Sequence, residues 1–234
     1  MIRQPYWQIK NVEFTGLEAL DGNEIEARIA ALLEGENSFF ISRRSILLVS
    51  SERLEEEMKR IFPRIERIAI DKKFPDTLQI AIHERTFWGI FCGSADEKGM
   101  VPCASIDKTG FAYETSPSAS GSLIIKIKSD VSDVAVPSVV VEKDLMERLL
   151  FLGVEVKRAI GSEVVLYEIS SRLPREIRLI VTDGYGLYFN RNDDFQNVFM
   201  VLKRVLEQDI KEKRSALEYI DLRFGNKVFY RFRQ

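Results

Sequence analysis

Few side chains of this chain have the types and spacing that covalent or acid–base chemistry requires. His83 is the only histidine, and it falls opposite the apolar residues of an alternating strand over 78–82, so we expect it to face solvent. The only cysteines are Cys92 and Cys103, and the glycine pair of residues 184–186 lacks the third glycine and the helix of a phosphate loop. A nucleophile beside a base, or a cluster of metal ligands, is not apparent. The sequence therefore predicts no catalytic residues, no metal and no cofactor.

The two cysteines lie on either side of a polar, glycine-containing loop. Cys92 and Cys103 flank residues 93–99, between two strand-like runs. In that position they could bridge across a hairpin, or they could be two semi-buried free thiols in a reducing compartment. The spacing alone leaves both alternatives open.

The composition is that of a globular chain with a substantial core. It has 234 residues, 45% of them hydrophobic, which is enough for one or two domains. Its 34 basic and 36 acidic residues give a net charge of −2 without a basic stripe, which argues against nucleic acid as a partner. There is no run of about 18 apolar residues, so we expect this chain alone to be soluble rather than to span a membrane.

The first third of the chain has the periodicities of a small helix-and-hairpin module. Asn23 and Ser51 are the expected N-caps of two helices. Two strands with period-2 alternation then meet at a tight turn, with Pro75 at its first and Asp76 at its second central position. The expected elements are a strand over 11–16, helices over 23–34 and 51–62, and strands over 67–71 and 78–83. The order β-α-α-β-β predicts two helices on one face of a three-stranded sheet.

The rest of the chain is dominated by short strands. A helix is expected over 142–152, with Gly153 as its C-terminal stop, and a second one follows a cap at Asp193 or Asp194. Strands are expected over 87–92, 101–106, 111–114, 123–128, 164–169, 177–182, 187–190, 219–224 and 227–232. Gly225 and Asn226 mark a hairpin turn between the last two. The predicted fold class is α+β, with a mostly antiparallel β domain of two helices that ends in an edge strand.

Together, these elements resemble the extracytoplasmic part of the FtsQ/DivIB family of bacterial cell-division proteins. The resemblance covers nearly the whole chain and rests on the order and spacing of several fragments. They are residues 9–16 (IKNVEFTG), 35–39 (GENSF), 62–65 (FPRI), 73–78 (KFPDTL), 84–85 (ER), 106–110 (IDKTG) and 219–228 (YIDLRFGNKV). The chain departs from the family pattern in having no cytoplasmic tail and no transmembrane helix ahead of Ile9. That anchor is expected either to have been trimmed or to lie outside the sequence.

The resemblance implies an organisation and a role. It implies a polypeptide-transport-associated (POTRA) domain over residues 1–85 and the family's β domain over 86–234. It implies a non-catalytic divisome scaffold on the outer face of the cytoplasmic membrane, which binds FtsB/DivIC-like and FtsL-like partners and helps regulate septal peptidoglycan synthesis. An extracytoplasmic location also favours the bridged state of Cys92 and Cys103.

The expected partner site is the C-terminal edge strand. An unpaired edge can accept a strand from another chain, with backbone hydrogen bonds supplying affinity. By position in the family motif, Arg223 and Phe224 match an Arg–aromatic pair that contacts the partner. Further partner-binding candidates are Lys227, Val228, Phe229 and Arg231. The alternative for the basic residues is that they only protect the edge against aggregation.

Two other functions compete with this one. A POTRA module of an outer-membrane assembly or secretion machine would usually have tandem repeats or a C-terminal barrel, and the sequence contains neither. An enzyme with an unrecognised site would need a deep pocket with convergent polar groups.

Overall fold

The structure is a computed structural model that describes residues 5–34, 44–117, 124–225 and 227–233. In it the chain forms two compact units, Met1–Thr86 and Phe87–Gln234. The motif at 35–39, the helix stop expected at Gly35 and the turn residue Asn226 lie outside the described residues.

The first unit is a three-stranded sheet with two helices. Strand β3 is central, parallel to β1 and antiparallel to β2, in the order β1-β3-β2. The elements are η1 (Pro5–Trp7), β1 (Asn11–Thr15), α1 (Gly22–Leu32), α2 (Ser51–Ile61), β2 (Ile65–Lys73) and β3 (Thr77–Glu84). The predicted β-α-α-β-β order is confirmed. One face of β3 buries Leu78, Ile80 and Ile82 in a core shared with both helices.

The N-caps of both helices of this unit lie slightly before the residues that the sequence predicts. The N-cap of α1 is Asp21, whose side chain accepts a hydrogen bond from the Asn23 N–H at 2.9 Å. The N-cap of α2 is Ser50, which accepts from the Arg53 N–H at 3.3 Å. The predictions of Asn23 and Ser51 were wrong, because another residue able to cap lies one or two positions before each. The residue that still has extended backbone geometry is the one that caps.

The turn between β2 and β3 also differs from the prediction. Lys73 pairs with Thr77, so the loop has the three residues Phe74–Asp76. Pro75 is thus the middle residue of this loop and does not take the predicted first central position of a tight turn.

A buried carboxylate fixes the loop between β1 and α1. Glu84, at the end of β3, accepts hydrogen bonds from the backbone N–H groups of Glu18, Ala19 and Leu20 at 2.8–3.0 Å. Its second oxygen accepts from Nε of Arg64 at 3.1 Å. Burial of Glu84 disfavours the charged carboxylate, but these donors outweigh that effect and lower its pKa.

The second unit is built on one ten-stranded sheet with two long helices. The order is β13-β12-β11-β10-β9-β7-β4-β5-β6-β8, mostly antiparallel, with parallel pairs at β11–β12, β9–β7 and β7–β4. The strands are β4 (Gly89–Cys92), β5 (Cys103–Ile106), β6 (Phe111–Thr115), β7 (Lys126–Ser129), β8 (Ser138–Val139), β9 (Val164–Ile169), β10 (Glu176–Val181), β11 (Gly186–Asn190), β12 (Leu217–Phe224) and β13 (Lys227–Phe232). The predicted α+β class is confirmed.

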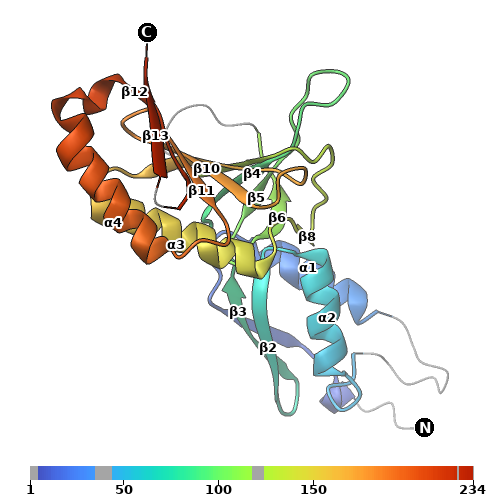
Figure 1. The fold of residues 1–234 in the computed structure, drawn as a ribbon. Coiled ribbons are helices and arrows are strands. Elements are labelled where there is room, and N and C mark those ends of the chain that lie inside the picture. The colour runs from blue at the N-terminus through green and yellow to red at the C-terminus, as the bar shows by residue number, and fades with distance from the viewer. Residues whose placement is uncertain (1–4, 35–43, 118–123, 226, 234) are drawn as a thin grey trace. The chain divides into compact units, whose positions relative to one another are not determined.

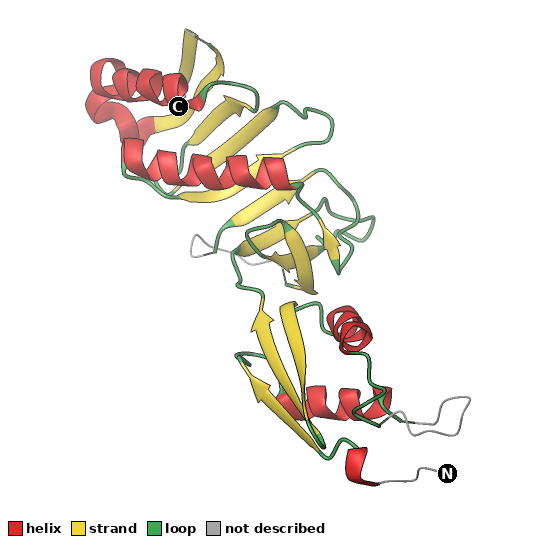
Figure 2. Cartoon of the chain, turned by 90° about the horizontal axis from the view of Figure 1, so that it is seen from below, coloured by secondary structure: helices red, strands yellow, loops and turns green. Residues whose placement is uncertain are grey.

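Helices α3 (Lys143–Ile160) and α4 (Phe195–Val205) lie side by side against one face of this sheet (Figure 1, Figure 2). The side chains that the helices bury pack with the alternating buried residues of the strands. On the strands these are Ile177, Leu179, Val181, Leu187, Phe189, Ile220 and Leu222. The opposite face of strands β10 to β12 carries the intervening polar and aromatic side chains.

Helix α3 continues past the predicted stop. Gly153 is inside the helix, which ends instead at Gly161 in the left-handed conformation. A Cβ built on Gly153 would lie 2.6 Å from the hydroxyl oxygen of Tyr167. The prediction was wrong because this glycine makes room for a side chain from β9 and does not end the helix.

Helix α4 is capped by Asp194, one of the two predicted residues. The Asp194 side chain accepts a hydrogen bond from the Gln196 N–H at 3.1 Å. Beyond Val205 the helix widens into a π-helical turn, η2 (Leu206–Ile210), and tightens into a 3-10 segment, η3 (Lys211–Ala216), which leads directly into β12.

Candidate functional site

The strand predicted to bind a partner is the outermost strand of the ten-stranded sheet. β13 pairs with β12 on one side, and no strand of the described part of the chain pairs with its other side. The register shifts between the two strands insert extra residues only into β12, so β13 itself is regular. A continuous backbone edge of six residues is therefore open.

The direction of the free backbone groups follows from one hydrogen bond just beyond the strand. The N–H of Arg233 donates to the carbonyl oxygen of Ala216 at 2.8 Å, so it points towards β12. In an antiparallel strand, successive residues point their N–H and C=O groups alternately to the two sides. If the alternation is followed back from Arg233 along the regular strand, the backbone N–H and C=O groups that point to the open side are those of Val228, Tyr230 and Phe232.

The side chains of β13 divide between its two faces. Val228 and Phe232 are partly buried against the main core, whereas Lys227, Phe229 and Arg231 are exposed on the other face. The predicted candidates therefore lie on one hairpin but not on one surface. The side chain of Val228 faces the core, so Val228 could contact a partner only through its backbone.

Two exposed aromatic rings lie together near the turn of this hairpin. Phe224 and Phe229 are 55% and 53% exposed, with edge-to-face rings whose centroids are 5.4 Å apart. Aromatic residues that lie next to an open edge supply large apolar contact area to a docking partner.

Arg223 has charge partners within its own chain. It donates from Nε and Nη2 to the Asp221 carboxylate at 2.8 and 2.6 Å, and from Nη1 to Glu176 of β10. The hydrogen bond and charge of Asp221, together with the charge of Glu176, raise the pKa of Arg223 although partial burial opposes this. The Arg223 side chain is only 22% exposed. Its positive charge is thus largely matched before any partner binds.

A row of aromatic and guanidinium groups crosses four strands on the face away from the helices. The rings of Tyr188 and Tyr219 are stacked with centroids 5.2 Å apart. Arg178 lies 5.1 Å from the centroid of Tyr188, and Arg231 lies 5.6 Å from that of Tyr219. Arg231 is also held by Glu218, with both contacts at 2.5 Å.

Sequence reasoning singled out Arg231 but missed the other three members of this row, Arg178, Tyr188 and Tyr219. The available signal was weak: Arg178 and Tyr188 each lie between two buried residues of their own strand. These side chains come together because Arg178 pairs with Tyr188 and Tyr219 pairs with Arg231 across neighbouring strands. A single sequence does not give the register of such pairs.

A small depression lies beside the turn of the same hairpin. It has a volume of about 220 Å³ and is lined by Arg175, Glu176, Asn190, Arg223 and Phe224. Ligand sites usually have about 300–1,000 Å³ and mostly apolar walls. This depression fits one side chain of a bound partner better than a substrate.

The other residues singled out from the sequence lie apart from this edge. His83 is exposed, as predicted, and lies 3.1 Å from a carboxylate oxygen of Glu66. Cys92 and Cys103 are direct cross-strand neighbours on β4 and β5 and are joined by a disulfide, with Cα atoms 4.1 Å apart. In the described residues, no group of three or more His, Cys, Asp or Glu could hold a metal ion. A membrane-crossing helix is likewise not found among them.

Comparison with known proteins assigns this architecture to a family. Residues 8–85 match a family model described as POTRA domain, FtsQ-type. The chain is 23% identical over 233 residues to Cell division protein DivIB of Clostridium botulinum, strain Loch Maree / Type A3, an alignment that covers 98% of this chain and 84% of that protein. The same name, identity and coverage are found for the protein of C. botulinum strain Hall. These matches show that residues 8–85 belong to the FtsQ-type POTRA domain family, and that the chain over nearly its whole length is similar to DivIB cell-division proteins.

Proposed function

We propose that this chain is a non-catalytic scaffold of the divisome, in which the open edge of β13 accepts a strand from an FtsB/DivIC-like protein. In this proposal residues 1–85 are the POTRA domain and residues 86–234 the β domain. The protein acts on the outer face of the cytoplasmic membrane, also engages an FtsL-like partner, and helps regulate septal peptidoglycan synthesis. The cell-division role has the support of the DivIB relatives.

The single observation that carries the proposal is the unpaired edge of β13. Exposed edges are normally shortened, bulged or covered, because an open one pairs with other chains. Here a regular strand of six residues is open, and the exposed pair Phe224 and Phe229 lies beside it. Backbone hydrogen bonds to the edge supply affinity, and side-chain contacts beside it supply specificity.

The faces of β13 define how a partner strand would lie. Its backbone would pair with Val228, Tyr230 and Phe232, whose N–H and C=O groups point outward. Its side chains on the face away from the helices would meet Phe229, Lys227 and Arg231. Arg231 is paired with Glu218, whereas Lys227 has no such acidic partner within the described part of the chain, so an acidic side chain of the partner fits beside Lys227.

The test is a calorimetric titration of the chain with the extracytoplasmic part of its FtsB/DivIC-like partner. Val228→Pro and Tyr230→Pro each remove one outward N–H and leave the pairing with β12 intact, since proline is tolerated where an edge N–H faces solvent. We expect each to weaken binding about tenfold or more, which corresponds to at least about 1.4 kcal/mol. Phe224→Ala should cost over about 1 kcal/mol as a truncated interface aromatic.

The matched control is Val154→Ser, which removes a comparably exposed apolar side chain from α3, a helix that packs against β9, four strands away from β13 in the order of the sheet. It should bind as tightly as the unmodified chain. If the two proline variants and Phe224→Ala all keep full affinity while the partner binds, strand addition at β13 is wrong.

A further inference from the structure

One end of the first unit exposes an unusual group of apolar side chains. Tyr6, Leu47, Leu48 and Phe74 are 50–60% exposed, and they come from three separate segments of the chain. Exposed apolar residues scattered singly need no explanation, but a contiguous group of them marks a binding surface.

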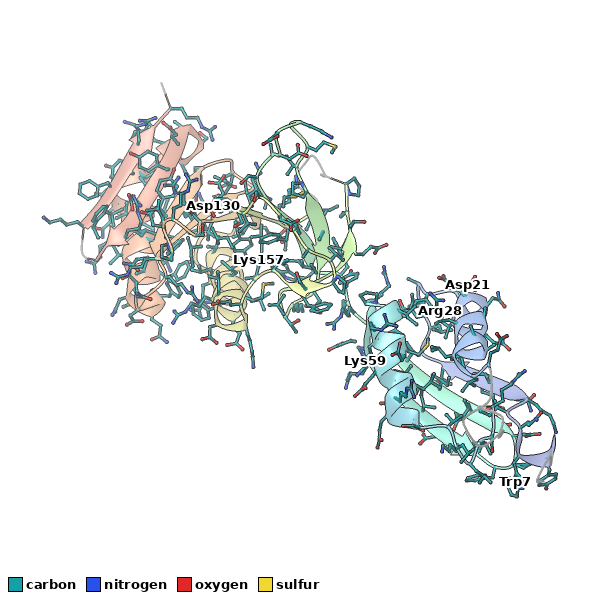
Figure 3. The ribbon with its side chains drawn as sticks, turned by 90° about the vertical axis from the view of Figure 1, so that its right-hand side faces the viewer. Trp7, Asp21, Arg28, Lys59, Asp130 and Lys157 are labelled. Atoms are coloured by element: carbon teal, nitrogen blue, oxygen red, sulfur yellow. A yellow bond between two sulfur atoms is a disulfide. The ribbon has the colours of Figure 1, made fainter. Side chains whose placement is uncertain are left out.

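Contacts show that these side chains form one group. The ring of Trp7 lies 5.2 Å from that of Tyr6 and 6.1 Å from that of Phe74, both edge-on. The N–H of Ile46 donates to the carbonyl oxygen of Trp7, and the antiparallel bridge between Gln8 and Ser45 continues this pairing. Leu47 and Leu48 come directly after this pairing, in a turn in which the Leu48 N–H donates to the carbonyl oxygen of Ser45. Trp7 lies at one extremity of the first unit (Figure 3).

We call this group the aromatic tip; its members are Tyr6, Trp7, Leu47, Leu48 and Phe74. It consists of the β2–β3 turn, the 3-10 segment η1 and the turn before α2, which lie at the same end of the unit (Figure 1, Figure 2). Turns that project together make a convex surface. The pocket described in this unit is elsewhere, lined by residues of α1 and Phe62.

The charges around the aromatic tip are predominantly positive. Lys72 and Lys73 directly precede Phe74, the backbone of Arg44 pairs with that of Ile9, and Lys10 bonds Asp76 in the turn at 3.1 Å. The nearby charged residues are Lys10, Arg44, Lys72 and Lys73, with Asp71 and Asp76. Among the described residues around the tip these are four cations and two carboxylates, and one of the cations, Lys10, is paired with Asp76.

We propose that the aromatic tip rests in the headgroup region of an anionic lipid bilayer. Tyr and Trp are amphipathic rings that prefer the boundary between hydrocarbon and water. Leu and Phe side chains reach the acyl chains, and flanking lysines are attracted to anionic headgroups. An exposed apolar tip made of turns, with a cationic surround, suits a lipid surface, whereas a peptide or helix needs a groove. The inference rests on the proposed function only for the presence of a membrane.

The tip contains its own spectroscopic reporter. The chain has two tryptophans, and Trp88 packs against the core of the second unit, so the Trp88→Phe variant leaves Trp7 as the only source of indole fluorescence. The probe is a set of vesicles of phosphatidylglycerol and phosphatidylcholine in equal parts. We expect the Trp7 emission to shift to the blue on vesicle addition, and to be quenched when the phosphatidylcholine carries brominated acyl chains.

Three variants in the Trp88→Phe background separate the contributions of apolar contact and of positive charge to vesicle binding. Phe74→Ser with Leu48→Ser should reduce vesicle affinity about tenfold by removing apolar contact. Lys72→Glu with Lys73→Glu should reduce it on anionic vesicles and lose the preference for them over pure phosphatidylcholine. Met200→Ser, a comparably exposed residue of the second unit, should change nothing. All of these side chains lie on the surface, so each variant is expected to fold, which circular dichroism checks.

The proposal is overturned if Trp7 shows neither shift nor quenching at millimolar lipid, or if Met200→Ser loses as much affinity as the tip variants. The tip variants should keep full affinity for the FtsB/DivIC-like partner, and Val228→Pro should keep full vesicle binding. A failure of the lipid-binding proposal can therefore be distinguished from a failure of the proposed strand addition at β13.

Discussion

The backbone of Gly153, in the middle of helix α3, lies directly against the hydroxyl group of Tyr167 on strand β9. A Cβ at position 153 would be 2.6 Å from Oη of Tyr167, closer than Cβ atoms approach other atoms in proteins, and 3.9 Å from the ring carbon that carries the hydroxyl. The hydroxyl oxygen of Tyr167 is therefore the single atom that makes a glycine necessary at position 153.

Gly153→Ala should destabilise the second unit. The added methyl group forces Tyr167 or α3 to shift in a packed core, which typically costs about 1–3 kcal/mol. Alanine in place of glycine would otherwise stabilise a helix interior by about 1 kcal/mol. A urea titration followed by circular dichroism measures the change in the free energy of unfolding.

A double-mutant cycle isolates the cause. In the Tyr167→Phe background the nearest atom is at ordinary contact distance, so Gly153→Ala should no longer destabilise the chain and should recover the helix propensity of alanine. If Gly153→Ala costs the same free energy in both backgrounds, the contact with the Tyr167 hydroxyl is not why glycine is required.

The first unit should lose stability in acid because of Glu84. Its pKa is lowered in the folded state from the usual value of 4.5, so its contribution is fully present above that value and is lost as the pH falls through the folded pKa. Glu84→Gln should cost about 1.5–3 kcal/mol at neutral pH, because hydrogen bonds to a charged group are replaced by weaker ones.

The same variant tests the pH dependence. With Gln at position 84, the free energy of unfolding of the first unit should vary less with pH below about 4.5 than it does in the unmodified chain. Thermal unfolding followed at pH 7 and at several lower pH values measures this. If Glu84→Gln left the pH dependence of the unfolding free energy unchanged in acid, carboxylates other than Glu84 would govern that dependence.

The sequence predicted element types better than element ends. Alternation at Leu78, Ile80 and Ile82 is a local property, and so the β3 strand and its buried face could be read directly. Gly153 could not be interpreted correctly, since a glycine that ends a helix and one that admits a tyrosine from β9 look the same in a sequence.

The candidate site was predictable only in outline. The sequence predicted that the last strand of the C-terminal hairpin lies at an edge of its sheet, and β13 does lie there. The stacking of Tyr188 on Tyr219, and the pairing of Arg223 with a carboxylate 47 residues away, depend on which strands are neighbours. Strand neighbours and register are set by the whole fold.

The disulfide should stabilise the second unit under oxidising conditions. Cys92 and Cys103 close a short loop of 11 residues between β4 and β5, for which the chain-entropy estimate is about 2–3 kcal/mol. Replacing both with serine should lower the free energy of unfolding by about that amount in urea. Both cysteines are buried, so the disulfide should react slowly with reductant until the unit unfolds. Equal stability of the oxidised chain and the serine variant would contradict the prediction.

Arg223 should prove to be as much a structural residue as a partner-binding one. Its removal leaves Asp221, which is largely buried, and Glu176 without the cation that lies between them. Breaking a buried ion pair by deleting one partner costs about 3–5 kcal/mol, and partial exposure at this site reduces the expected cost of Arg223→Ala to about 1–3 kcal/mol. Arg175→Ala, exposed beside the same depression, is the matched control and should cost less than about 0.5 kcal/mol.

The decisive comparison is with a variant in which Arg223 and both of its carboxylate partners are neutral, while Arg178, which also donates to Glu176 at 3.3 Å, keeps its charge and is partly exposed. Arg223→Gln combined with Asp221→Asn and Glu176→Gln leaves no uncompensated carboxylate, so it should recover most of the stability lost by Arg223→Ala. If this triple variant is stable yet still fails to bind the FtsB/DivIC-like protein, Arg223 contributes to the interface itself. If it binds normally, the loss of binding in Arg223→Ala reflects a distorted β12 rather than a lost contact. Measuring unfolding in urea and partner affinity on the same four proteins separates the two, because only a structural role ties affinity to stability across the series.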